Sequence, residues 1–159
     1  MSPRAGWLLG ALLAATPAAA ATDYAPLRLL MSCLGEPAPR GVLGAMTGAG
    51  TLGTRTGPGE DDDYCWALAP PLAWDGMSFS TLCVVTDEAG EIAAHPEFYW
   101  AGAMAPWTEV WLVSAAPKDE LLAWARAALP AGSRFEIDPP GAAAGSALSC
   151  SEWRFPLPG

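Results

Sequence analysis

The sequence predicts an α+β fold: a mostly antiparallel sheet with one main helix packed on one face, braced by disulfides. Three observations predict it. Several strand-like segments precede one amphipathic helix, two more strand-like segments follow that helix, and four cysteines lie beyond the N-terminal leader. Strands that pair with near neighbours and share one helix are typical of the α+β class. About 138 residues follow the leader, a length that predicts a single domain.

Residues 1–21 are predicted to be a cleavable secretory signal peptide. Arg4 is their only charge, an apolar run extends from Gly6 to Ala15, and Thr16, Pro17 and a series of alanines follow. This order of a positive end, an apolar stretch and small residues is typical of a secretory signal. A membrane-spanning helix needs about 20 apolar residues, and this run has about half of that. We therefore expect residues 22–159 to be a periplasmic or secreted protein without a membrane span.

The mature chain is predicted to be strongly acidic. Loss of Arg4 leaves 7 basic residues against 17 acidic ones. A surface of this sign repels nucleic-acid phosphates and anionic membranes, so neither is expected as a partner. Net charge alone indicates solubility rather than a specific function.

Four cysteines predict two disulfides. Cys33, Cys65, Cys83 and Cys150 are even in number, and an exported protein folds in an oxidising compartment. No pair has CxxC spacing, so neither a redox motif nor a zinc site is indicated. Three pairings are open. We favour Cys65–Cys83, which would clip neighbouring strands, together with Cys33–Cys150, which would tie the first strand to the last.

The N-terminal part of the mature chain is predicted to contain one strand and a long loop. Leu27–Leu34 is a compact apolar run and the expected first strand. Residues 35–63 are rich in Gly and Pro and are expected to form a flexible loop, with one helical turn near Val42–Met46 and Thr51–Gly59 as the best candidate for disorder. Four acids at 60–63 lack the alternating spacing of an EF-hand loop, so no metal site is expected.

The rest of the chain is predicted to alternate between strands and turns around one helix. Turn residues such as Asp75-Gly76 separate the strand-like runs, and Pro96 confines its segment to a sheet edge or to two fragments. The expected strands are Tyr64–Ala69, Met77–Thr86, Glu91–His95 with Glu97–Gly102, Thr108–Ala115, Ser133–Asp138 and Ala147–Phe155.

The expected helix is Pro117–Leu129. Proline suits a first helical position, and Asp119 and Glu120 lie in the first turn, where they favour the helix dipole. Leu121, Trp124 and Ala125 share one face, so we expect Trp124 to be a core residue rather than a ligand platform.

No catalytic motif is evident. His95 is the only histidine, and no GxSxG elbow accompanies it. Asp75, Glu97 and Glu109 lie near tryptophans, and a pair of carboxylates about 5–9.5 Å apart can hydrolyse glycosides without histidine. A small carboxylate-dependent hydrolase of cell-wall or other glycans is therefore the alternative function. No cofactor is expected.

The densest aromatic region predicts a partner-binding site. Phe98, Tyr99, Trp100 and Trp107 fall within ten residues, and aromatic side chains are enriched in interfaces as well as in cores. Most of the aromatic residues are needed for the core, and we expect one or two exposed members to anchor a partner. The favoured expectation is thus an exported, non-enzymatic binding, accessory or inhibitor protein with a protein or glycan partner.

Overall fold

The computed structural model describes residues 24–35, 39, 41–56, 64–86, 89–94, 96, 98–99, 108–138 and 145–151. The predicted signal peptide, residues 1–21, lies outside these ranges. The described residues form a six-stranded antiparallel sheet with helices, which confirms the predicted α+β class.

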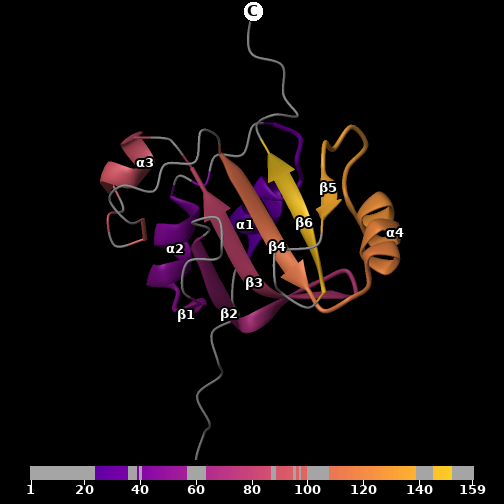
Figure 1. Cartoon of the computed structure of the whole chain (residues 1–159), viewed down its shortest axis with the longest axis horizontal. Coiled ribbons are helices and arrows are strands. Elements are labelled where there is room, and N and C mark those ends of the chain that lie inside the picture. Colours follow the sequence, from indigo (N-terminus) through magenta and orange to yellow (C-terminus); the bar gives the residue numbers. More distant parts are fainter. Residues whose placement is uncertain are drawn as a thin grey trace, which may run out of the picture.

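The sheet has the strand order β1-β2-β3-β4-β6-β5, and every neighbouring pair is antiparallel (Figure 1). Its strands are β1 (Leu52–Thr56), β2 (Tyr64–Trp74), β3 (Met77–Val85), β4 (Glu109–Ser114), β5 (Glu136–Asp138) and β6 (Ser146–Ser151). The last strand, β6, lies between β4 and β5 and is antiparallel to both. β4 and β5 are therefore parallel to each other but do not pair. The two strands on either side of residues 118–128, β4 and β5, therefore form a split β-α-β arrangement with β6 between them.

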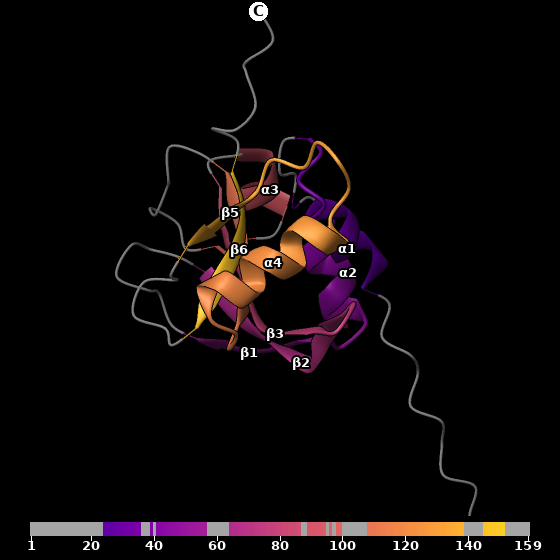
Figure 2. The same ribbon diagram turned by 90° about the vertical axis from the view of Figure 1, so that its right-hand side faces the viewer.

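Helices α1 (Ala25–Leu30), α2 (Val42–Gly48) and α4 (Lys118–Ala128) lie on the same side of the sheet (Figure 2). Between them and the sheet is the main core, where apolar side chains from both layers are removed from water. The largest fully buried side chains are Phe79, Leu27, Met31, Leu43, Leu72, Leu82, Leu112, Leu121, Leu148, Val84 and Val110.

Helix α4 confirms the predicted main helix to within one residue at each end. Asp119 and Glu120 occupy its first turn and Arg126 its last, so charges of both signs complement the helix dipole. Leu121 and Ala125 are fully buried one turn apart, which fixes the face that the helix turns to the sheet.

The prediction of a first strand at Leu27–Leu34 is wrong, because the first part of this run is helix α1. Leu27 and Met31, four residues apart, are both fully buried, whereas Leu29 between them is exposed. A strand would turn Leu27 and Leu29 to the same face. Short apolar runs do not distinguish a helix from a strand by periodicity, and Pro26 is tolerated in the first turn of a helix.

The predicted loop of residues 35–63 contains more regular structure than expected. The helical turn near Val42–Met46 is the seven-residue helix α2, and the segment expected to be disordered holds strand β1. β1 is an edge strand held by backbone pairing with β2. At Gly53 a β-carbon would lie only 3.1 Å from the carbonyl oxygen of Ala67, so glycine allows the close approach of these strands.

Two further strand predictions are corrected. Strand β2 does not end at Ala69 but continues through Pro70 and Pro71 to Trp74, with a register irregularity between Ala67 and Leu72. We call residues 70–74 the β2 extension. They lie beyond the part of β2 that pairs with β1, where proline costs no ladder hydrogen bond on that side.

The segment expected to form a strand at Glu91–His95 is instead the short helix α3 (Ala89–Ala94). Alanine and glutamate favour a helix, and the neighbouring Pro96 had served only to limit the predicted strand to a sheet edge or to two fragments. No helix in the part of the chain that the structure describes is long and apolar enough to cross a membrane.

Candidate functional site

Both predicted disulfides are present, and they join the cysteines in the pairing that the sequence favoured. Cys33 pairs with Cys150 of β6, with a Cα–Cα distance of 5.6 Å, and both residues are fully buried. Cys65 of β2 pairs with Cys83 of β3, and these two residues are also direct partners in the strand register. The first bond ties the segment after α1, rather than a strand, to the last strand.

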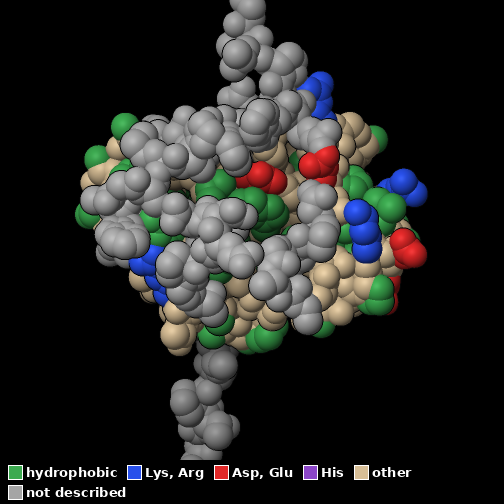
Figure 3. Space-filling model, viewed as in Figure 1, with side chains coloured by type: hydrophobic (Ala, Val, Ile, Leu, Met, Phe, Trp, Pro, Cys, Tyr) green, Lys and Arg blue, Asp and Glu red, His purple; other side chains and the backbone are tan. Residues whose placement is uncertain are grey.

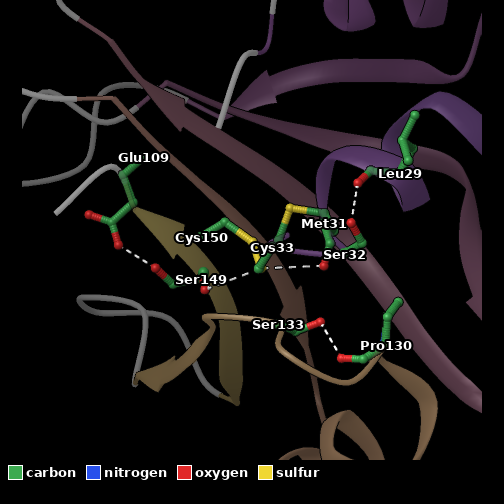
Figure 4. The surroundings of a disulfide bond; sticks show 9 residues. All are labelled: Leu29, Met31, Ser32, Cys33, Glu109, Pro130, Ser133, Ser149 and Cys150. Atoms are coloured by element: carbon green, nitrogen blue, oxygen red, sulfur yellow. Dashed lines mark hydrogen bonds between the residues drawn. A yellow bond between two sulfur atoms is a disulfide. The ribbon is translucent and has the colours of Figure 1, made fainter. Parts of the chain in front are cut away.

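The turn around Cys33 is held by several bonds in addition to the disulfide (Figure 4). The backbone N–H of Arg134 donates to the Cys33 carbonyl at 2.8 Å, and the Ser32 hydroxyl donates to the Leu29 carbonyl at 2.7 Å. Cys33 itself is thereby fixed to both β6 and the chain after α4. In Figure 4 the side chain of Leu29 points away from the disulfide.

Three side chains cap the backbone of the β2 extension. The hydroxyl of Tyr24 donates to the carbonyl of Pro70, and Arg28 Nη2 donates to the carbonyl of Ala73 at 2.6 Å. Trp124 Nε1 of α4 donates to the carbonyl of Trp74 at 3.1 Å. β1 does not reach this part of β2, and these donors give its carbonyls hydrogen-bond partners. They also hold α1 along the extension.

Aromatic side chains fill the space beneath these caps. The rings of Trp74 and Phe79 both contact Trp124, with centroids 5.2 Å away in each case and edge-to-face geometry. The Arg28 guanidinium lies 5.8 Å from the Trp74 ring centroid, at a distance where a cation–π attraction operates. Trp124 is thus partly buried and packs against the main core, and its indole N–H has an acceptor; the prediction that it serves packing rather than ligand binding agrees with this position.

The exposed side chains of α1 and the β2 extension are apolar, and the partly exposed Arg28 lies between the two elements. Leu29 is 75 % exposed and Leu34 is 55 % exposed, and they are the large hydrophobic residues that stand out from the surface in the described part of the chain. We define the α1–β2 surface as the exposed apolar residues of α1, of the turn after it and of the end of β2. They are Ala25, Pro26, Leu29, Leu34, Ala69, Pro70, Pro71 and Ala73.

The described residues of α1 and of the β2 extension include no acidic side chain, and the first acidic residue after them is the exposed Asp75. Helix α4, in contrast, exposes both signs of charge, and Figure 3 shows basic and acidic side chains interspersed on that side of the molecule. The sequence contained one signal for the surface: in a helical phase, Leu29 falls opposite the buried pair Leu27 and Met31.

The predicted aromatic binding residues are partly placed by the structure. Phe98 and Tyr99 are each 5 % exposed and contact Trp66 and Tyr64 edge-to-face, with centroids 5.8 and 5.7 Å apart. Both therefore pack in the main core. Trp100 and Trp107 lie outside the described residues, so binding through this segment stays a prediction.

Two of the three candidate carboxylates are far apart. Asp75 lies in the turn before β3, and Glu109 pairs in register with Val85 at the other end of that strand. Eight residue steps along β3 correspond to about 27 Å, well beyond the separation that a glycosidase pair needs. Asp75 and Glu109 cannot act as such a pair. His95 and Glu97 lie outside the described residues.

On the sheet face opposite the helices, the Ser149 hydroxyl donates to the Glu109 carboxylate. Thr86 and Thr108 lie just beyond the ends of β3 and β4, and their hydroxyls are 2.9 Å apart. Within the described ranges no three His, Cys, Asp or Glu side chains converge as metal ligands would. This geometry places the Glu109 carboxylate beside the Ser149 hydroxyl.

No protein-family model, curated protein or solved structure matches the chain.

Proposed function

We propose that the chain is an exported, non-enzymatic protein that binds a protein partner through the α1–β2 surface, as an accessory subunit or an inhibitor. The observation that carries this proposal is the exposure of Leu29 and Leu34 on either side of Cys33. Burial of a large aliphatic side chain is favourable by about 1.5–3 kcal/mol of free energy. Two such side chains exposed to water therefore favour a surface that a partner covers.

The rigidity of this surface supports a binding role. Tyr24 and Arg28 fasten α1 to the β2 extension, and the Cys33–Cys150 bond fastens its C-terminal end to β6. A surface that is already ordered loses little conformational entropy on binding, which leaves more of the interaction free energy as affinity.

The two disulfides and the separation of Asp75 from Glu109 support the other parts of the proposal. Disulfides persist in oxidising compartments, in agreement with export through the predicted signal peptide. The hydrolase alternative loses its Asp75–Glu109 pair, because those carboxylates lie at opposite ends of β3.

The test is native mass spectrometry of the protein recovered from its own cell envelope and medium without reductant. We expect a chain that lacks the leader, has about four hydrogens fewer than the reduced form, and carries a stoichiometric protein partner. A Leu29→Ser/Leu34→Ser variant should lose that partner, with affinity reduced by about tenfold or more.

The matched control is Ala123→Ser/Ala127→Ser, which adds two hydroxyls to the exposed side of α4. It should keep the partner. An unaltered complex in the leucine variant, or a bare monomer in both fractions of the unaltered protein, would contradict the proposal.

A further inference from the structure

The two disulfides lie in different surroundings. Cys33 and Cys150 are fully buried in the main core between the helices and the sheet. Cys65 is partly exposed and Cys83 is 6 % exposed. Both belong to a smaller cluster with Trp111, on the sheet face opposite the helices. A thiolate must reach a sulfur atom to cleave a disulfide, so only the second bond offers a route that does not require the core to open.

The two disulfides also differ in what else holds their residues together. Cys65 and Cys83 are one step in a ladder that continues on both sides, with Tyr64 opposite Val84 and Trp66 opposite Leu82. Cleavage of this bond leaves those backbone hydrogen bonds in place.

The Cys33–Cys150 bond joins segments that are 117 residues apart and are not paired as strands. Its cleavage would release the turn after α1 from β6, while the hydrogen bond from the Arg134 N–H to the Cys33 carbonyl would still link the turn to the chain after α4. The fold therefore depends on this bond much more than on the Cys65–Cys83 bond.

We propose that Cys65–Cys83 is a thiol–disulfide exchange site for a dithiol reductant, whereas Cys33–Cys150 is a permanent structural bond. This inference is independent of the proposed binding function. A thiolate of the dithiol attacks Cys65 Sγ, the more exposed side of the bond, and Cys83 leaves as a thiolate.

The second thiolate of the reductant then attacks the reductant's first sulfur, which is bonded to Cys65 Sγ in the mixed disulfide. This step releases Cys65 and closes the reductant's disulfide. Two electrons pass from the dithiol to the protein, and its two protons end on Cys65 and Cys83. The product keeps the β2–β3 ladder, so the folded protein has two oxidation states at this site.

The experiment is a titration of the unaltered, oxidised, full-length mature protein with dithiothreitol at neutral pH. Each sample is quenched with iodoacetamide, the four cysteines are quantified separately by peptide mass spectrometry, and near-ultraviolet circular dichroism follows the fold. We expect Cys65 and Cys83 to be alkylated together, at least about tenfold faster than the other pair, with the near-ultraviolet spectrum retained. With glutathione, a monothiol, the adduct should form on Cys65.

Alkylation of all four cysteines together, earlier alkylation of Cys33 and Cys150, or an adduct on Cys83 would overturn the proposal. A pair of variants gives a second, independent measurement. Cys65→Ser/Cys83→Ser should keep the near-ultraviolet spectrum of the oxidised protein, and Cys33→Ser/Cys150→Ser should lose it. The reverse pattern would also overturn the proposal, and the titration decides the matter if both variants fail to fold.

Discussion

Replacement of Tyr24 by phenylalanine tests whether the side-chain caps stabilise the β2 extension. The change keeps a buried ring in place and removes only the hydroxyl that donates to the Pro70 carbonyl. Loss of one such bond typically costs 0.5–1.5 kcal/mol, and the carbonyl that remains is partly buried without its donor. We expect the free energy of unfolding to fall by about 1–2 kcal/mol, which corresponds to about 3–6 °C in Tm for a domain of this size.

The same variant has a second signature at alkaline pH. Burial raises the pKa of Tyr24 above its ordinary value of 10.0. The unfolded chain therefore ionises this phenol first, so the stability that Tyr24 contributes is complete below pH 10.0 and is lost as the pH rises through the higher folded-state pKa.

Urea unfolding of both proteins at pH 8 and above pH 10 provides the assay. The difference between the unaltered protein and Tyr24→Phe should be largest at pH 8 and should shrink above pH 10, because the other tyrosines titrate in both proteins and cancel. Equal urea midpoints at pH 8, or a difference that grows with pH, would refute the reasoning.

Two other substitutions test neighbouring features. Trp124→Phe removes the donor to the Trp74 carbonyl, and urea unfolding should show a loss of about 1–3 kcal/mol; an unchanged midpoint would mean that this hydrogen bond contributes nothing. Gly145→Ala would place a β-carbon 2.1 Å from the Ser114 carbonyl oxygen at a positive φ of 119°, so we expect a loss of about 3 kcal/mol or more in thermal unfolding. Gly76→Ala is its control, because Gly76 also has a positive φ but open space around it, and it should cost only about 1–2 kcal/mol.

The strands and the main helix were predictable where the pattern of the sequence and the final environment agree. Met77–Val85 and Glu109–Ser114 are rich in β-branched and aromatic residues and lie in the middle of the sheet, where such residues pack well. Helix α4 has apolar residues at helical spacing and acidic residues in its first turn. In these elements the local preference and the tertiary packing point to the same structure.

The errors occur where tertiary contacts decide the structure. Leu27–Leu34 is apolar enough for a strand, and only its packing against the sheet makes Leu27 and Met31 the buried pair of a helix. The residues of β1 have little local preference for a strand. They form one because their backbone pairs with that of β2.

The candidate site was harder to predict than the fold. Exposure of Leu29 follows from the helical phase of α1, whereas the apolar run had predicted a strand there. The density of aromatic residues around Phe98 and Tyr99 predicted a binding site. Large aromatic rings also supply much of the apolar surface that a small core buries, and these two rings pack there.

The position of β6 between β4 and β5 has a consequence for how the chain folds as it is made. Until residues 146–151 exist, β5 has no strand to pair with, β4 has one bare edge, and Cys33 has no partner. Cys65 and Cys83, only 18 residues apart, can be joined long before that point. Synthesis from the N-terminus therefore delays completion of the sheet until the chain is nearly finished, and we expect oxidation to proceed in a fixed order, with the local disulfide first and the long-range disulfide last.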